Sequence, residues 1–256
     1  MLNGLAKLKD DGQMAIIQNG SSLFNGDAGS GPSEIRRYLI ENDWLDAVVQ
    51  LPNNAFYNTG IATYIWIVMK NKPVTHQGKV QLIDASACCS ARRKNIGSKN
   101  VDITKVDRDL IIEAYGAYVD GIYNGVDEND KAIIVKSKVI DAIDFGYNKI
   151  VVETPKLDED GNIVMKKKKP VADKSKRDTE NVPLTEDIDV YFEREVIPYN
   201  SQAWIDKSKT KVGYEIPFTR TFYEYKQIEP SDVIAARIEE HEKSLMAKLH
   251  DLFGGK

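Results

Sequence analysis

Short apolar stretches alternate with turn residues through the first 86 residues of the chain. Four of these stretches have the length and the β-branched or aromatic content of strands, at residues 13–18, 45–51, 61–69 and 79–85. The first is short and apolar, which predicts a buried strand. After it a helix is predicted, opened by Pro32 and Ser33 and ended near Asn42. The order of strand, helix, strand and strand is typical of one half of an α/β sheet with an antiparallel edge.

Beyond the fourth stretch the pattern changes. Residues 103–118 place apolar side chains at helical spacing and predict a second helix. Residues 149–154 and 163–167 flank a polar turn at residues 158–161, which predicts a hairpin. The stretch at residues 166–182 is rich in lysine and poor in apolar side chains, so we interpret it as a mobile loop.

Composition narrows the class of protein. The 256 residues are 42% hydrophobic and 29% charged, as in an ordinary globular protein. The longest apolar run, residues 61–69, is too short to span a membrane, and no apolar leader opens the chain, so we expect a cytoplasmic protein without membrane contact. The only cysteines, Cys88 and Cys89, are adjacent; we expect two reduced thiols and no metal site.

The chain has a formal net charge of -4, whereas a protein that binds nucleic acid on its own usually has an excess of basic residues. If the chain acts on DNA, local patches or a partner must supply the contacts. The lysine run at residues 166–169 has two interpretations, a solvated strand end or a contact with a phosphate backbone.

A glycine-rich loop at residues 19–31 lies between the first strand and the first helix. A dinucleotide-binding loop requires the spacing G-x-G-x-x-G, whereas Gly26, Gly29 and Gly31 occur in another order. The Gly-Lys-Ser/Thr of a phosphate-binding P-loop is also missing. The residues of this loop therefore do not predict a nucleotide site.

The loop at residues 51–61 joins two predicted strands and carries two adjacent aromatic residues, Phe56 and Tyr57. They could be core residues beneath a loop. Loops at the carboxyl ends of α/β strands, however, are where such sheets place their sites. An aromatic pair beside Asn58, Thr59 and Gly60 could stack on a planar ligand and hydrogen-bond its edge, as an enzyme that handles a flipped nucleobase requires.

Seven segments, in order along the chain, carry a resemblance to a known family. They are Asn19–Phe24, Glu34–Tyr38, Leu51–Trp66, Gly78–Ser86, Asp144–Pro155, Tyr191–Pro198 and Gly213–Tyr225. Each is weak alone, but together they strongly resemble the modification subunits of type I restriction enzymes. The resemblance implies transfer of a methyl group from S-adenosylmethionine to N6 of adenine in DNA.

Two motifs of that family are missing from the chain. The family positions the adenine amine with an Asn-Pro-Pro-Phe/Tyr loop and holds the cofactor with an earlier glycine-rich loop, and this sequence contains no Asn-Pro pair and no such loop. We therefore expect no catalytic or cofactor-binding residue in this chain, with the S-adenosylmethionine site upstream, and no activity of this piece alone.

By position, the resemblance implies a target-base contact. Phe56 is the first candidate for stacking on the flipped base and Tyr57 the second, with Asn58, Thr59 and Gly60 beside them. The residues that end the first strand, Asn19 and Gly20, are expected to face the same cleft. The implied partners are DNA, the specificity and restriction subunits, and a second methyltransferase subunit.

The resemblance also implies an α/β fold, namely the C-terminal half of a Rossmann-like methyltransferase sheet followed by a mixed, largely helical C-terminal region. We expect residues 1–100 to form the second half of the methyltransferase domain. Residues 101–213 are expected to hold the helix, the hairpin and the lysine-rich loop, and residues 214–256 a C-terminal helix for subunit contacts.

That last helix is predicted from Ser231 almost to the C-terminus. Ile238, Leu245 and Leu252 recur every seven residues and form a narrow apolar stripe of the coiled-coil kind. The stripe could pack on the chain's own core or on a partner, and the resemblance favours the specificity subunit. A non-catalytic module that only binds that subunit is the alternative to a piece of an enzyme.

Overall fold

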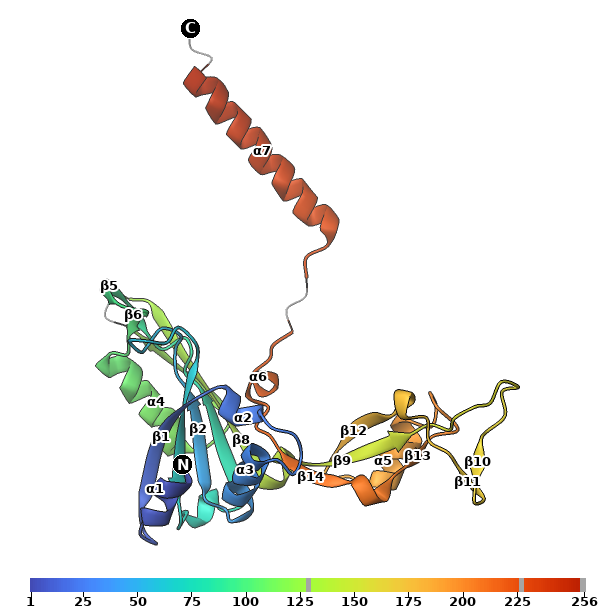
Figure 1. Ribbon diagram of the computed structural model, residues 1–256. Coiled ribbons are helices and arrows are strands. Elements are labelled where there is room, and N and C mark those ends of the chain that lie inside the picture. The colour runs from blue at the N-terminus through green and yellow to red at the C-terminus, as the bar shows by residue number, and fades with distance from the viewer. Residues whose placement is uncertain (128–129, 226–227, 254–256) are drawn as a thin grey trace. The chain divides into compact units, whose positions relative to one another are not determined.

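The computed structural model describes residues 1–127, 130–225 and 228–253, and it divides into two units, residues 1–222 and 223–256 (Figure 1). The first unit is built around a six-stranded sheet in the order β1-β3-β2-β4-β8-β7. Its strands are β1 (Gln13–Asn19), β2 (Leu45–Gln50), β3 (Thr63–Met69), β4 (Lys79–Asp84), β7 (Gly121–Val126) and β8 (Ala132–Asp141). The sheet therefore takes strands from both sides of residue 100, where the sequence had suggested a boundary.

Strand direction defines one edge of this sheet. β3 is antiparallel to β1 and to β2, β2 is parallel to β4, and β8 is antiparallel to β4 and β7. β1, β2 and β4 consequently run the same way, and their last residues, Asn19, Gln50 and Asp84, lie along one edge, which we call the carboxyl edge. The predicted α/β class and the four predicted strands are confirmed.

Helices cover both faces of the sheet (Figure 1). The strand β2 is buried on both sides, so its residues alternate between two cores: Val48 packs with the first cluster and Val49 with the second. The first cluster also buries Leu5, Leu23 and Leu39. These belong to α1 (Leu2–Lys7), α2 (Ser21–Phe24) and α3 (Gly31–Glu41). Each such buried side chain stabilises the fold by about 1.5–3 kcal/mol.

The second face is covered by α4 (Lys105–Ala117), the helix predicted at residues 103–118. Its start is fixed by a capping box, in which the side chain of Thr104 accepts a hydrogen bond from the backbone of Asp107 and Asp107 accepts one from the backbone of Thr104. Its end is fixed by Tyr118, which adopts the left-handed conformation with φ 48°. This prediction is confirmed.

The prediction that the first strand is buried is wrong. β1 pairs only with β3 at the end of the sheet, so every second residue faces solvent and none is fully buried. Ile17, for example, is exposed. The apolar composition of a strand does not distinguish a central strand from an outermost one, and β1 is outermost.

The remaining strands of the first unit build a second sheet around β9 (Gly146–Glu153). Its partners are β12 (Asp178–Pro183), β13 (Trp204–Ile205) and β14 (Lys211–Tyr214). α5 (Ile188–Glu195) packs on this sheet, and Phe192 of the helix shares a small core with Ile150, Val152 and Val182.

This second sheet corrects two expectations. Residues 149–154 do not form a hairpin with residues 163–167, because β9 pairs instead with β12, inside the stretch interpreted as a mobile loop. A tight turn does form at residues 158–161, followed by a two-stranded hairpin of β10 (Met165–Lys166) and β11 (Lys169–Pro170). After residue 100 the structure combines helices with strands, in agreement with the predicted mixed α/β fold.

β14 returns to the first part of the chain and contacts α3. The backbone N–H of Tyr214 donates to Ser33 Oγ at 3.0 Å, and the buried guanidinium of Arg36 donates to the carbonyl of Tyr214 at 2.5 Å. Next comes α6 (Phe218–Thr221), whose Phe218 lies in the first core. Residues 214–222 thus belong to the first unit, and the helix assigned to residues 214–256 begins later.

The second unit contains α7 (Ser231–Phe253), as predicted. Its heptad residues Ile238, Leu245 and Leu252 are all exposed. Among the residues that the structure describes, none of the helices combines the length and apolar content that a membrane crossing requires.

Short elements complete the chain. These are β5 (Ser90–Ile96), β6 (Lys99–Asp102), and the 3-10 turns η1 (Val74–His76), η2 (Ala142–Phe145), η3 (Lys174–Lys176) and η4 (Lys207–Lys209). Both cysteines are free thiols, as predicted, and burial raises the pKa of Cys88 to about 12, which leaves it an unreactive core side chain.

Candidate nucleic-acid interface

The loop between β2 and β3 lies at the carboxyl edge. Leu51 N–H donates to the carbonyl of Thr63 at 2.8 Å, which closes the base of the loop, and an isolated bridge between Phe56 and Thr59 turns its tip at Tyr57 and Asn58. Phe56 is half-buried and packs against the second core cluster. Tyr57 is 58% exposed and is therefore the more accessible of the two aromatic rings.

The other predicted base-contact residues reach the same edge. Asn19 pairs with Thr63, the first residue of β3, so the end of β1 lies beside the end of the loop. Asn19 is fixed by two hydroxyl groups, Ser21 Oγ donating to its side-chain oxygen at 3.0 Å and Ser22 Oγ to its carbonyl at 2.8 Å. At Gly20 a Cβ would lie 3.3 Å from the ring of Tyr64.

Sequence reasoning thus brought seven residues to one edge, although they form two groups. Residues 56–60 occupy the loop and residues 19–20 the end of β1, and in the described structure no hydrogen bond joins the groups. Asn58 and Gly60 are exposed and Thr59 is half-buried. Nucleobase contacts require accessible rings and polar groups, and the loop offers both.

The hairpin of β5 and β6 was not predicted, and it borders this loop. Ser98 N–H donates to the carbonyl of Tyr57 at 3.0 Å, and Asn100 N–H donates to the carbonyl of Asn54 at 3.3 Å. The turn depends on Gly97, which has φ 57° and where a Cβ would lie 2.8 Å from the carbonyl oxygen of Tyr57. The hairpin and the loop are therefore joined by backbone hydrogen bonds and a close backbone contact.

The hairpin is strongly basic. Its one acidic residue, Asp102, pairs with Lys99 at 3.1 Å and with Arg92. The ammonium of Lys99 and the guanidinium of Arg92 hold the pKa of Asp102 below its usual value. Arg93 and Lys94 are exposed, and neither makes an ion pair with a residue that the structure describes. The signal in the sequence was the presence of four cationic residues within residues 92–99.

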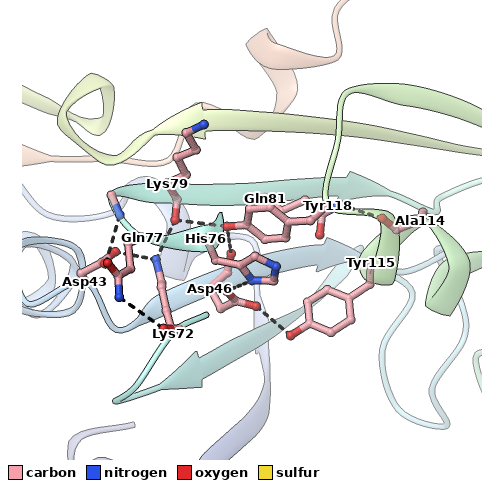
Figure 2. Close-up of polar contacts among 11 residues, drawn as sticks. Asp43, Asp46, Lys72, His76, Gln77, Lys79, Gln81, Ala114, Tyr115 and Tyr118 are labelled. Carbon is pink, nitrogen blue, oxygen red and sulfur yellow. Dashed lines mark hydrogen bonds and ion pairs between the residues drawn. The ribbon is translucent and has the colours of Figure 1, made fainter. Parts of the chain in front are cut away.

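A polar cluster lies at the opposite edge of the sheet, near the start of β2 (Figure 2). Asp46 is fully buried, and its two oxygens bind His76 Nδ1 at 2.9 Å and the hydroxyl of Tyr115 at 2.7 Å. The His76 ring stacks on Tyr118 with ring centroids 3.4 Å apart. Burial, with the Asp46 carboxylate beside it, raises the pKa of Tyr115. The cluster joins η1 and α4 to the sheet.

Two further contacts belong to the same edge. Lys72 is buried and donates to Asp43 Oδ1 at 2.7 Å and to the carbonyl of Lys79 at 2.6 Å (Figure 2). Gln81 donates to the carbonyl of Ala114 and to Ser137 Oγ, both at 2.8 Å. Most of these groups have protein partners, although the side-chain oxygen of Gln81 is buried without one among the described residues, so the cluster mainly holds elements together. Within the described part of the chain, no group of three or more His, Cys, Asp and Glu side chains is arranged to hold a metal ion.

Comparison with known proteins assigns the family. The family model of the N-6 DNA methylases matches residues 1–158, which include the whole carboxyl edge and its basic hairpin. The chain belongs to the N-6 DNA methylase family. It is 32% identical over 95 residues to the Type I restriction enzyme MjaVII methylase subunit of Methanocaldococcus jannaschii, covering 35% of this chain and 16% of that protein.

The chain is similar to two further proteins. The Type I restriction enzyme MpnII methylase subunit of Mycoplasma pneumoniae is 32% identical over 105 residues, covering 40% of this chain and 18% of that protein. The methyltransferase subunit of the type I restriction-modification system of Streptococcus thermophilus aligns with 28% identity and a TM-score of 0.43, covering 55% of this chain and 25% of that one. The predicted resemblance to modification subunits is confirmed, and the chain spans less than a fifth of the length of these two curated relatives.

Proposed function

We propose that this N-6 DNA methylase chain contributes the target-base side of a type I modification subunit, and that the complete subunit transfers a methyl group from S-adenosylmethionine to N6 of adenine in DNA. One observation carries the proposal: the Phe56–Tyr57 loop lies at the carboxyl edge of a sheet that the family model matches. A module that only binds a specificity subunit would not require accessible aromatic rings there.

The chemistry explains why such a loop is needed. The lone pair of the adenine amine is delocalised into the ring, so the base must be held rigidly while the methyl group is delivered. An extruded base gains about 1–3 kcal/mol from stacking on an aromatic ring. Phe56 and Tyr57 supply rings, and Asn58 and Thr59 supply an amide and a hydroxyl group for the edge of the base.

The glycine-rich loop does not fit the cofactor. At Gly26 a Cβ would lie 2.4 Å from Ser30 Oγ, so this glycine serves the turn of its own loop. At Gly29 a Cβ would lie 3.3 Å from the side chain of Lys211, and the carbonyl of Asn25 accepts a hydrogen bond from Arg36 at 2.9 Å. The loop is occupied by its neighbours, so we infer that another part of the complete subunit holds S-adenosylmethionine.

The proposal that the cofactor binds outside this chain can be tested directly. Calorimetric titration of the 256-residue chain with S-adenosylmethionine is expected to give no binding in the micromolar range, whereas the complete subunit should bind the cofactor and methylate adenine. Micromolar binding to the chain alone would refute the inference that another part of the complete subunit holds the cofactor. Absence of adenine methylation by the complete subunit, with its specificity partner and DNA, would refute the proposed function.

We further propose that α7 contacts the specificity subunit, within an assembly that also holds DNA, a restriction subunit and a second methyltransferase subunit. The heptad residues Ile238, Leu245 and Leu252 are 60%, 59% and 76% exposed, and a stripe of this kind is stabilised when a matching helix covers it. His241 and Lys248 interrupt the stripe, which disfavours pairing with a second copy of itself.

Deletion of residues 231–256 is therefore expected to abolish co-purification with the specificity subunit and to leave the melting temperature of the first unit unchanged. Leu245→Glu should have the same effect, because it places a charge in the stripe. Met246→Glu is the matched control, since Met246 is the adjacent residue, is 65% exposed and points away from the stripe. A large fall in melting temperature with association intact would instead assign the stripe to the core of this chain.

A further inference from the structure

We infer that the basic hairpin of β5 and β6 contacts the phosphate backbone of DNA beside the extruded base, with Arg93 and Lys94 as its phosphate-contacting side chains. The inference rests on the proposed function and extends it, since it assigns a DNA contact outside the aromatic loop. Neither the hairpin nor its charge is needed to explain the sheet.

The first step is position. The hairpin is held against the candidate base loop by the two backbone hydrogen bonds from Ser98 and Asn100 and by the close approach of Gly97 to Tyr57. Figure 1 shows β5 and β6 extending beyond the end of the six-stranded sheet. A nucleotide whose base reached Tyr57 would have its flanking phosphates within the span of such a hairpin, because neighbouring phosphates of an extruded nucleotide stay attached to it.

The second step is charge. The hairpin carries four cationic residues and one acid in a chain whose formal net charge is -4, so its sign is opposite to that of the chain as a whole. Arg92 and Lys99 are already engaged by Asp102, which braces the two strands. Arg93 and Lys94, in the part of β5 where the pairing register shifts, have no ion-pair partner among the described residues. Unpaired cations on a projecting element are the groups that neutralise phosphate and release counterions.

The third step is a comparison with another basic segment of the chain, which shows that charge alone does not distinguish the β5–β6 hairpin. The hairpin of β10 and β11 carries four consecutive lysines, also exposed, at Lys166–Lys169. It belongs to the segment between β9 and β12, and the hydrogen bonds of that segment are made with its own neighbours, such as Val164 N–H with the carbonyl of Lys156. It therefore carries as many cationic residues, without the hydrogen bonds to the base loop, and serves as a matched control.

The test measures the salt dependence of DNA binding with the full 256-residue chain and a short fluorescent duplex, without S-adenosylmethionine. Each lost phosphate contact lowers the slope of log affinity against log salt by about 0.9. The double variant Arg93→Gln/Lys94→Gln is expected to lower the slope by about 2 and the affinity at low salt roughly tenfold or more. Lys167→Gln/Lys168→Gln, with the same change of charge, is expected to leave the slope nearly unchanged.

Equal slopes for the two double variants would overturn the inference, because total charge rather than position would then govern binding. Failure of the unaltered chain to bind the duplex at low salt would also overturn it. As a control, the melting temperatures of both variants should equal that of the parent chain, which shows that the slopes compare folded proteins. The binding test contains no cofactor, so its result does not depend on methylation. If the slope changes as expected but the complete subunit does not methylate adenine, the hairpin contact is supported and the proposed function is refuted.

Discussion

Phe56→Ala in a complete modification subunit is expected to lower the rate of adenine methylation about ten- to a hundredfold, because stacking on an extruded base is worth about 1–3 kcal/mol. Tyr57→Ala is expected to have an effect of the same size. Tyr57 is 58% exposed, so its truncation costs little packing. Phe56 packs against the second core cluster, so its truncation should also lower stability modestly.

The two variants are compared by kcat/KM for methyl transfer and by melting temperature. Tyr57→Phe is the matched control, since it keeps the ring and removes only the hydroxyl, and it should retain most of the activity. A Phe56→Ala subunit that melts early yet keeps full specific activity would show that Phe56 is a core residue. If both alanine variants keep full activity, the base is held elsewhere.

The central strands were predictable because their signal is local. β2, β3 and β4 each bury most of their residues, so runs of Val, Ile, Leu and Met mark them directly in the sequence. α4 was equally local, because Thr104 and Asp107 fix its start within four positions. The burial of β1 could not be inferred, since whether an apolar strand lies at an edge depends on a neighbour that sequence spacing does not reveal.

The second sheet escaped prediction for the opposite reason. β12 has a single buried residue, Val182, and its place as a strand is decided by pairing with β9 about 30 residues earlier. The hairpin of β5 and β6 is equally polar, and its pairing is interrupted by an irregularity after Ala91. Strands of this kind are set by tertiary contacts that local pattern does not contain.

For the site, sequence reasoning reached the loop but not its surroundings. The aromatic pair and the end of β1 were placed at one edge because the carboxyl ends of parallel strands coincide. That Tyr57 would be more exposed than Phe56 depends on the core beneath Phe56 and on the turn at Gly97, which contacts Tyr57. Neither could be read from the spacing of residues 51–61.

Arg36 shows how strongly the fold depends on such distant contacts. Its side chain is almost fully buried, and Nε donates to the carbonyl of Tyr214, 178 positions away, at 2.5 Å. Nη1 donates to the carbonyls of Ser22 at 3.1 Å and Asn25 at 2.9 Å. One planar guanidinium thus joins α3, the glycine-rich loop and β14. Burial lowers the pKa of Arg36 because the charged form loses water, although an arginine stays charged at neutral pH.

Arg36→Ala is therefore expected to lower the free energy of unfolding by about 3–5 kcal/mol, since it leaves three carbonyl groups without their donor, at about 1–3 kcal/mol for each one that stays buried, and opens a cavity. Arg36→Lys should recover only part of this loss, because a single ammonium does not reproduce the several donors of the guanidinium.

Arg37→Ala is the matched control. Among the described residues, the Arg37 guanidinium pairs with the exposed carboxylates of Glu34 and Glu41, so a loss of about 0–1 kcal/mol is expected. The measurement is urea unfolding of the 256-residue chain, followed by tryptophan fluorescence. Equal midpoints for Arg36→Ala and Arg37→Ala would mean that the contact between β14 and α3 does not stabilise the first unit.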